Sequence, residues 1–597
     1  MEREGSARSA QVEYIKGAEA THVNCSRFHT TTLHLRQTVT QEARQHVSLL
    51  FKLGSVVALL NLIAPQSLFV TLPGASATVI PAEQHPHRHS GTCQKTKVAI
   101  LGAGITSITI AQTLANASVT DFILVEYKDE IGGRLHHENF GKGPDGKPLL
   151  VECGANWAQG LGKPEPKRPL TELLQKKKWN IRNTPSNVSA ILTYNETGKV
   201  DFTSEIEEYE EAVERMVAVA GELLADNIQD RTMREGLTHA GWKPNQRKYP
   251  QAADAVEWWL YDGEQAYIPE ETSLVFNAAV SNFTFLQFSD ENNFIVDQRG
   301  HNTWLKGEAS EFLAANDPRL HLSTIVDRIG YSGEGVVVVN KDGSCIEADY
   351  AVTTFSLDVL QQEDVVSFEP ALPEWKQVAI ESFLLGTYTK IFLQFDETWW
   401  PTDTEFFLYA DPVQRGWYPI WQSLDKEGFF PGSHAIFVTV TERESQRVER
   451  MTDAETQAEV MAVLRAMFPD VDVPGPTAFQ YPRWGTTPWA YGSFSFSCWP
   501  GGTTLEQHQN LRANMDRLWF AGEHTSASYF GYMQGAWYEG RDVGNRLARL
   551  VNGQCDGAAR GDGVCGEMVR YEVLHGTTEE DEYNIQNGWD GSSFQAS

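Results

Sequence analysis

Positive charge is scarce in this sequence. Its 597 residues include 49 Lys and Arg against 79 Asp and Glu, which gives a formal net charge of −30 at pH 7. A surface of this sign repels the phosphates of nucleic acids, and DNA and RNA are therefore excluded as partners. The same surface attracts cationic small molecules, although solubility alone also explains an acidic composition.

Cysteine is scarce as well, and its spacing lacks the pattern of a metal site. The seven cysteines form no CxxC pair and no Cys/His cluster, so no metal is expected. Cys555 and Cys565 lie close together in a Gly-rich segment near the C-terminus, where they could close a small disulfide. The alternative is that all six cysteines after Cys25 are unpaired thiols.

Only one long apolar run stands out, and it lies well inside the chain. Residues 52–77, KLGSVVALLNLIAPQSLFVTLPGASA, combine a cation, an apolar stretch and an Ala75-Ser76-Ala77 ending. This order is typical of a secretory signal peptide cleaved after Ala77. Residues 1–51 form a polar extension in front of it. We favour a start codon assigned too early over a signal anchor or a buried helix.

The segment that follows fits secretion. Residues 78–94 are rich in Pro and His and are typical of a linker. Pro65 and Gln66 inside the apolar run count against a membrane anchor, so no stable membrane association is expected. Four glycosylation sequons after Ala77 permit, without requiring, an extracellular glycoprotein. They begin at Asn116, Asn187, Asn195 and Asn282.

Hydrophobic periodicity predicts a mixed α/β chain without internal repeats. Helical patterns cover Pro169–Lys178, Thr203–Ile228 and Asp453–Met467, the last of which ends before Pro469. Strand-forming residues fill 320–355, with a hairpin turn at Asp342 and Gly343, and also fill 388–440. A strand entering a long helix covers 518–550, and 553–597 form a C-terminal tail.

The segment KVAILGAGITSITIAQTL, from Lys97 to Leu114, has the pattern of a dinucleotide-binding turn. Gly102 permits the tight turn, Gly104 lets the backbone approach a pyrophosphate at the helix N-terminus, and Ser107 is small enough for helix–strand packing. Glu126 ends the next strand, where an acid binds a ribose hydroxyl. An acid at that place disfavours the extra phosphate of NADP.

A second Gly pair follows closely, and it selects the cofactor. Gly132, Gly133 and Arg134 suit another approach to the pyrophosphate. Together with the first turn, they resemble the FAD site of the flavin amine oxidase superfamily. An NAD enzyme would need a second nucleotide motif or a dehydrogenase site, and the sequence contains neither.

The resemblance extends over about residues 95–552 and is strongest to the secreted polyamine oxidases of plants and fungi. Its most telling match is Tyr388-Thr389-Lys390-Ile391-Phe392. The other matching segments are Gly154–Trp157, Asp297–Gly300 and Phe520–Thr525. The resemblance implies a Rossmann-like FAD-binding domain built from residues 95–180, 270–367 and 489–552. A substrate-binding domain of mixed sheet and helices would come from residues 181–269 and 368–488.

Matching positions imply the residues that hold FAD. Glu126 would bind the adenosine ribose, Arg134 the pyrophosphate, Val326 the adenine through its backbone, and Glu523 the ribose or ribityl side. The helix starting near Gly531 would aim its N-terminus at the flavin ring. The remaining members of this set are Gly102, Gly104, Ser107, Gly133, Asn156, Trp157, Trp489, Gly522 and Tyr532. Ser493 and Phe494 stand where monoamine oxidases carry a flavin-bound Cys, so the FAD is expected to be non-covalent, with Cys498 nearby.

The implied reaction is oxidation of an amine at the carbon next to nitrogen. Hydride passes to flavin N5, the imine hydrolyses to amine and aldehyde, and dioxygen restores the flavin and yields peroxide. Tyr532 and Phe494 are the expected aromatic walls, Tyr388 lines the approach, and Lys390 holds a water against N5. Without the resemblance, Lys390 would be expected to face solvent and the aromatic residues to belong to the core.

The substrate tunnel departs from the family pattern. The plant-type enzymes carry an acid two positions after the Gly-Ala-Asn-Trp motif, and this sequence has Gln159 there. Glu264 matches a second tunnel acid, but Gln265 follows where an aromatic residue is expected. An amide keeps a hydrogen-bond acceptor and loses the ion pair, so an acetylated or less charged amine becomes a candidate substrate. An L-amino-acid oxidase, or a flavin-binding protein without turnover, is the alternative.

Overall fold

The computed structural model describes residues 92–161, 179–187, 190–225, 228–281, 291–384, 386–493, 499–526 and 529–555. Several expectations therefore lie outside the described residues. They concern the N-terminal extension, the signal-like segment, the linker up to residue 91, the helix at 169–178, Asn282, Phe494, Cys498 and the tail from residue 556.

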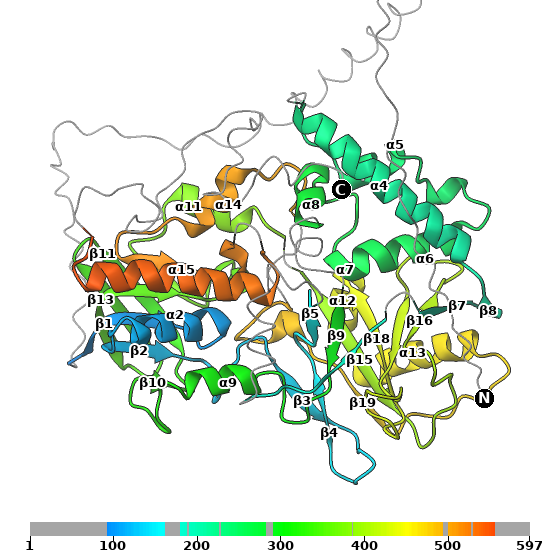
Figure 1. Cartoon of the computed structure of the whole chain (residues 1–597), viewed down its shortest axis with the longest axis horizontal. Coiled ribbons are helices and arrows are strands. Elements are labelled where there is room, and N and C mark those ends of the chain that lie inside the picture. The colour runs from blue at the N-terminus through cyan, green and yellow to red at the C-terminus, as the bar shows by residue number, and fades with distance from the viewer. Residues whose placement is uncertain are drawn as a thin grey trace, which may run out of the picture. The chain divides into compact units, whose positions relative to one another are not determined.

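An eight-stranded sheet carries the Gly-rich turn (Figure 1). Its order is β10, β2, β1, β13, β12, β11, β14, and β20 also pairs with β13. The strands are β1 (Gln94–Leu101), β2 (Phe122–Val125), β10 (Leu320–His321), β11 (Val326–Ser332), β12 (Gly335–Asn340), β13 (Cys345–Thr353), β14 (Ser367–Glu369) and β20 (Leu518–Phe520). β10, β2, β1, β13 and β20 run parallel. The apolar end of β1 is fully buried, as expected for a parallel strand covered on both faces.

Two helices that are far apart in sequence lie side by side on this sheet (Figure 1). They are α2 (Ile105–Asn116) and α15 (Met533–Val551). A Cβ at Gly540 would lie 2.7 Å from the Thr106 carbonyl oxygen, and a Cβ at Gly544 would lie 2.7 Å from Thr113 Cβ. The two glycines therefore allow the C-terminal helix to approach the helix that follows the Gly-rich turn.

A seven-stranded sheet forms the other large layer, in the order β19, β15, β18, β17, β16, β7, β8. The strands are β7 (Ile191–Asn195), β8 (Gly198–Val200), β15 (Tyr388–Gln394), β16 (Phe406–Tyr409), β17 (Ile420–Ser423), β18 (Ala435–Thr441) and β19 (Ala478–Gln480). Every residue of β18 is buried, so both faces of the sheet centre are covered. Lys390 pairs with Thr439 at this centre, which makes the lysine an interior residue.

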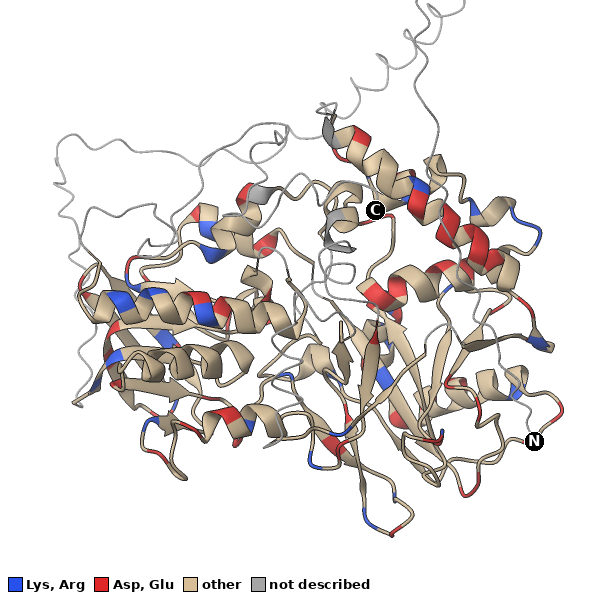
Figure 2. Cartoon of the chain, viewed as in Figure 1, with Lys and Arg blue, Asp and Glu red and all other residues tan. Residues whose placement is uncertain are grey.

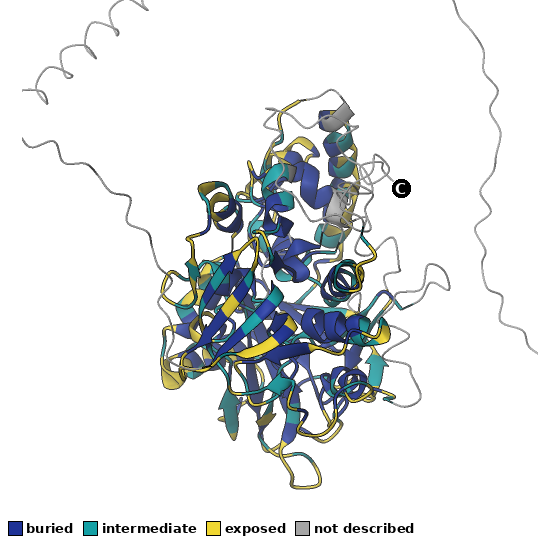
Figure 3. Ribbon diagram, turned by 90° about the vertical axis from the view of Figure 1, so that its left-hand side faces the viewer, coloured by how far each residue is buried: buried dark blue, intermediate teal, exposed yellow. Residues whose placement is uncertain are grey.

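Helices pack against one another beside the seven-stranded sheet (Figure 1). They are α4 (Thr203–Ala225), α5 (Met233–His239), η2 (Pro244–Gln246), α6 (Pro250–Glu257), the π-helix η3 (Trp258–Asp262), α7 (Gly263–Gln265) and α8 (Leu274–Ser281). Figure 2 shows that acidic residues recur along α4, whose sequence is rich in Glu. Figure 3 shows that most residues of the central strands and helices are buried, while exposed residues lie on loops and on the outward-facing parts of some strands and helices.

Short elements complete the fold. The strands are β3 (His137–Phe140) and β4 (Leu149–Glu152), which pair with each other, and β5 (Trp157–Gln159), β9 (Asn292–Ile295) and β6 (Asn183–Pro185), which form a three-stranded sheet. The helices are α9 (Thr303–Ala309), α10 (Leu357–Leu360), α11 (Glu374–Glu381), α12 (Glu442–Glu449), α13 (Asp453–Met467), η5 (Trp484–Thr486), α14 (Leu505–Arg512) and η6 (Glu523–Thr525).

The mixed α/β fold predicted from periodicity is confirmed, and several boundaries agree closely. The helix expected at Asp453–Met467 is α13, which begins with a capping box between Thr452 and Glu455. The hairpin turn at Asp342 and Gly343 joins the antiparallel strands β12 and β13. Helix α4 begins at the expected Thr203 and is described as far as Ala225.

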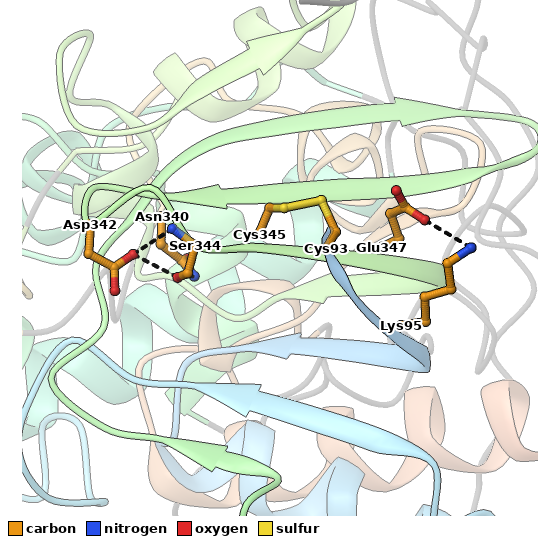
Figure 4. The surroundings of a disulfide bond; sticks show 7 residues. All are labelled: Cys93, Lys95, Asn340, Asp342, Ser344, Cys345 and Glu347. Carbon is orange, nitrogen blue, oxygen red and sulfur yellow. Dashed lines mark hydrogen bonds and ion pairs between the residues drawn. A yellow bond between two sulfur atoms is a disulfide. The ribbon is translucent and has the colours of Figure 1, made fainter. Parts of the chain in front are cut away.

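A disulfide joins Cys93, next to the start of β1, to Cys345, the first residue of β13 (Figure 4). The pair is separated by 252 residues, and only the pairing of β1 with β13 brings the two sulfurs together. Cys555 is also disulfide-bonded, whereas Cys153 is free and buried. The alternative of six unpaired thiols is therefore wrong. Cys565 lies outside the described residues, so its pairing with Cys555 stays a prediction.

Two further features concern the described residues alone. None of their helices combines the length and the hydrophobicity that crossing a bilayer requires. The same residues bring together no group of three or more His, Cys, Asp and Glu side chains that could hold a metal ion.

Candidate active site

A cavity of about 440 Å³ lies where the two large sheets meet the Gly-rich turn. Its walls include residues from the first turn, the second Gly pair, the starts of β11 and α15, and strands β15 to β18. The predicted site residues on its walls are Gly102, Gly104, Glu126, Gly133, Arg134, Asn156, Trp157, Gln159, Glu264, Val326, Tyr388, Lys390, Trp489, Gly522, Glu523 and Tyr532. The fold thus brings together residues that are spread over more than 400 positions of the sequence.

The first turn has the backbone that its glycines predict. Gly102 has a φ of 120°, and a Cβ there would clash with the Thr354 hydroxyl. Ser107 is fully buried behind this turn, and its Oγ lies 2.6 Å from Thr354 Oγ1. Ser107 is absent from the cavity wall, and its hydroxyl supports the turn through Thr354.

Gly104 faces open space within the cavity. A Cβ at this position would meet no protein atom within 4 Å, although Gly104 is the N-cap of α2. Gly133 closes the opposite side, because a Cβ there would lie 3.3 Å from Gly104 Cα. Bare backbone on both sides and a helix N-terminus suit an anionic diphosphate, so these residues fit the predicted dinucleotide.

Glu126 follows β2 directly and is held by backbone donors. Its Oε2 accepts a hydrogen bond from Ala103 N at 2.6 Å, and its Oε1 accepts one from Lys128 N at 2.9 Å. Burial raises the pKa of Glu126 against these hydrogen bonds. A carboxylate at this wall can also accept from ribose hydroxyls. Val326 begins β11 on the same cavity wall, as expected for the adenine end.

Arg134 and Glu523 pair with each other across the cavity wall. Arg134 Nη2 donates to Glu523 Oε2 at 2.6 Å. Their sequence motifs predict contacts with separate parts of FAD, and nothing in their spacing of 389 residues indicates a pair. The ion pair joins the second Gly pair to η6, so the two halves of the predicted cofactor site are held together.

Lys390 is buried, with only 5% of its surface exposed. Its Nζ donates to the Gly154 carbonyl oxygen at 2.7 Å and to Asn156 Oδ1 at 2.9 Å. Burial lowers the pKa of Lys390 to about 8. The expectation from the residues alone, that this lysine faces solvent, is therefore wrong. Asn156, expected to contact the cofactor, lines the cavity and also accepts the hydrogen bond from the lysine.

Tyrosines surround the lysine side of the cavity. The Lys390 Nζ lies 5.8 Å from the centre of the Tyr388 ring, and burial raises the pKa of Tyr388 to about 12. The Tyr532 hydroxyl donates to Glu264 Oε1 at 3.2 Å. Glu264 is open to water within the cavity, yet the surrounding protein desolvates it enough to raise its pKa.

Aromatic side chains line the remaining wall. The Trp157 ring stacks on Phe406, with 6.2 Å between ring centres. Trp489 contacts His136 edge-on, and the ammonium of Lys128 lies 4.5 Å from its ring centre. Sequence reasoning missed several wall residues: Trp259, Phe406, Ile420, Phe437 and Thr439. Trp259 belongs to η3, and the other four lie in buried strands, where the apolar pattern does not distinguish a cavity wall from ordinary core.

Comparison with known proteins identifies the class that this site defines. Residues 108–548 match the model of a family described as flavin containing amine oxidoreductase. Polyamine oxidase 7 of Oryza sativa subsp. japonica is 36% identical over 486 residues, which cover 78% of this chain and 97% of that protein. Polyamine oxidase 1 of Zea mays is 37% identical over 463 residues, or 75% of this chain and 89% of that protein.

Solved structures agree with this fold. Wild-type putrescine oxidase bound to putrescine has a TM-score of 0.60 at 15% identity and covers 77% of this chain and all of its own. The chain belongs to the flavin containing amine oxidoreductase family. It is a flavin-dependent amine oxidase whose cofactor is FAD, as the sequence analysis predicted.

The Gly-rich turn yields a matched pair of tests. Gly104→Ala leaves the fold intact, because the new Cβ meets no protein atom, but it fills space needed by the diphosphate. We expect a folded protein with at least about tenfold weaker FAD binding. Gly102→Ala clashes with Thr354 and has a left-handed φ, so it lowers the melting temperature of the apoprotein. FAD titration and thermal unfolding of both apoproteins measure this, and unchanged FAD affinity in Gly104→Ala contradicts the assignment.

Proposed function

We propose that this enzyme oxidises polyamines or related amines and releases an aldehyde, an amine and hydrogen peroxide. One observation carries the proposal: the buried Lys390 and the Glu264–Tyr532 pair line the same cavity as the dinucleotide turn. The names of the plant relatives and of the putrescine oxidase structures support an amine with more than one nitrogen.

The cofactor residues fit a non-covalent FAD. The Gly104 backbone, Glu126, Arg134 and Val326 would hold the adenosine diphosphate part, and Glu523, Gly522 and Trp489 would lie toward the flavin. Cys153 is the cysteine on the described part of the cavity wall, and it is a free thiol. Burial raises its pKa, so the nucleophilic thiolate is disfavoured and a bond to flavin is not expected there.

Bound FAD supplies the acceptor for hydride from the carbon beside nitrogen and then passes electrons to dioxygen. The protein keeps the reacting amine neutral, because the aromatic walls at Tyr388 and Phe406 penalise a charged amine. Lys390 acts at the other end of the reaction. Two of its three ammonium hydrogens are taken by Gly154 and Asn156, and the third is available to hold water or oxygen in the cavity.

The substrate class follows from the two tunnel positions. Glu264 offers a carboxylate to an ammonium group, and a bound cation reverses the cost of desolvating that carboxylate. Gln159 lies on the same cavity wall and offers hydrogen bonds without charge. We propose that one nitrogen of the substrate is an ammonium near Glu264, and that the group near Gln159 is neutral, as in an N-acetylated polyamine.

We also propose the domain division implied by the resemblance. Every strand of the seven-stranded sheet falls within residues 181–269 and 368–488, the proposed substrate-binding domain. Nearly all residues of the eight-stranded sheet fall within 95–180, 270–367 and 489–552, the proposed FAD-binding domain. The substrate therefore enters from one domain and meets a cofactor held by the other.

Secretion is a further part of this proposal. The disulfide between Cys93 and Cys345 supports an oxidising compartment. Asn195 is the last residue of β7, directly before the turn to β8, and its Oδ1 accepts hydrogen bonds from the Thr197 amide and hydroxyl, which leaves its Nδ2 for glycan attachment. Sequencing the N-terminus of the natural protein and treating it with a glycosidase test the cleaved leader and the glycan. A mature chain starting at Met1 without glycan contradicts both.

A panel of amines tests the function directly. Under anaerobic conditions, spermidine, N-acetylated spermine and leucine are mixed separately with the holoenzyme, and loss of the flavin absorbance is followed. We expect both polyamines to bleach the flavin, and leucine to leave it oxidised. Rapid bleaching by leucine alone would favour an L-amino-acid oxidase, and no bleaching by any amine would favour loss of turnover.

Lys390→Met separates the two half-reactions. We expect an unchanged fold and bound FAD, with reoxidation by dioxygen slowed at least about tenfold because the ammonium is lost. In the parent, reoxidation should slow as the pH rises through about 8, where Lys390 loses its proton, and the variant should lack this step. Stopped-flow absorbance measures both rates, and Lys97→Met, at an exposed ion pair, is the control. Equal reoxidation rates and pH profiles in parent and Lys390→Met remove the lysine from this role.

Gln159→Glu tests the neutral half of the tunnel. A second carboxylate should lower the KM of spermine about tenfold by adding an ion pair, and should leave the KM of an N-acetylated polyamine nearly unchanged. Gln159→Met, which removes the hydrogen bonds and keeps the length, is the matched control. An unchanged KM for spermine in Gln159→Glu would place Gln159 outside the substrate path.

A further inference from the structure

The part of the cavity wall that carries Glu264 follows directly on a π-helix. The π-helix η3, five residues from Trp258 to Asp262, runs directly into α7, which contains Glu264. Trp259 from this segment lines the cavity together with Glu264. A π-helix is wider than an α-helix and persists where surrounding contacts hold it in place. The contacts at its two ends therefore decide where the Glu264 carboxylate lies.

Buried ion pairs hold both ends of this π-helix. Glu257, the residue just before it, is fully buried and accepts hydrogen bonds from Arg234 Nη1 at 2.7 Å and Nη2 at 2.5 Å. Trp242 Nε1 donates to the same carboxylate at 2.8 Å. Asp262, the last residue of the π-helix, is 1% exposed and accepts from Arg415 Nη1 at 2.5 Å and Nη2 at 2.7 Å.

Arg415 spans the whole segment. Its Nη2 also donates to Glu257 Oε1 at 2.8 Å, so one guanidinium binds the residue before the π-helix and the residue that ends it. Arg415 comes from the turn between β16 and β17 of the seven-stranded sheet. The next residue, Gly416, has a φ of 79°, and a Cβ there would lie 2.8 Å from Trp258 Nε1. The strand turn is therefore packed tightly against the start of the π-helix.

Each buried carboxylate of this network faces a guanidinium, and Arg234 Nε also donates to the half-exposed Glu270 at 2.6 Å. Two guanidinium groups face two fully buried carboxylates, as burial of ions requires. A planar guanidinium can serve two carboxylates at once with fixed geometry, and an ammonium cannot reproduce that fork. None of these four side chains lies on the cavity wall. The network therefore acts on the cavity only through the segment that it fixes.

We propose that Arg415, with Glu257, Asp262 and Arg234, is a positioning device that fixes the π-helix and thereby sets the Glu264 carboxylate at the distance that binds the substrate ammonium. This rests on the proposed function, because it assigns the affinity for a cationic amine to Glu264. The device acts on substrate binding and leaves the flavin chemistry unchanged, since Lys390 belongs to β15 and the residues that fit the dinucleotide belong to the Gly-rich turn and β11.

Arg415→Lys tests the device. We expect the KM of spermidine to rise about tenfold, with kcat changed less than about twofold. The inhibition constant of hexylamine, a competitor without a distal ammonium, should change less than about twofold. Glu264→Gln alone should raise the KM of spermidine. Adding Arg415→Lys to Glu264→Gln should raise that KM almost no further, because the carboxylate that Arg415 positions is already absent.

Arg319→Lys is the matched control. Arg319 also makes a two-point ion pair, with Nε and Nη2 donating to Asp317 at 2.9 and 2.7 Å, but this pair lies beside β10 and not at the cavity. It should leave the KM of spermidine unchanged. If Arg415→Lys gives no soluble holoenzyme, Asp262→Asn replaces it and is expected to raise the KM of spermidine in the same way.

Three results would overturn the proposal. The first is an equal loss of affinity for spermidine and hexylamine, and the second is full additivity with Glu264→Gln. The third is an unchanged KM of spermidine in Arg415→Lys together with a raised KM in Glu264→Gln. This result rejects the positioning device and leaves the proposed function intact. A parent enzyme that oxidises no cationic amine rejects both.

Discussion

The diphosphate of the cofactor needs backbone without side chains, and much of this fold is arranged around that need. Gly104 leaves an open space at the start of α2, and Gly133 approaches it from the other side. The parallel strands β1 and β2 place both segments at one edge of the sheet. Gly540 and Gly544 then let α15 lie against α2, so that the start of α15 reaches the same cavity. Small residues far apart in sequence thus serve one requirement, the close approach of backbone to an anion.

A single residue connects the cofactor side to the reacting side. The Gly154 carbonyl accepts a hydrogen bond from Lys390, and a Cβ on Gly154 would clash with the Arg134 carbonyl. Glycine is therefore required at position 154, where the segment carrying Arg134 passes the carbonyl that accepts from the lysine. Because Arg134 is also paired with Glu523, displacement of this glycine would disturb both the C-terminal half of the site and the lysine. A shift of Gly154 would therefore move Lys390 and Arg134 together.

The sequence predicts this fold well where a local pattern has a single physical cause. The Gly-rich turn, the capped helix α13 and the β12–β13 hairpin each follow from a few adjacent residues. Pairings across long separations were not predictable, because neither the disulfide between Cys93 and Cys345 nor the Arg134–Glu523 ion pair leaves a local signal. The burial of Lys390 is the clearest case. Alternation in its strand predicts a solvent-facing lysine, and only the coverage of the sheet on both faces makes that position interior.

The position of charged groups inside the cavity, and not the net charge of the protein, makes the site favour a cation. The net charge of −30 draws cations toward the whole surface, where solvent and salt screen each interaction. Within the cavity, by contrast, Arg134 and Glu523 neutralise each other, and Lys390 is a cation whose pKa is lowered to about 8. Glu264 is held apart from both, on a segment whose own charged neighbours, Glu257 and Asp262, are fully occupied by arginines. Because those arginines are already paired, they do not compete for Glu264, and the substrate ammonium is left as its strongest partner. In the proposed function, selectivity for an amine with a distal charge then follows from the burial of the ion pairs behind the wall.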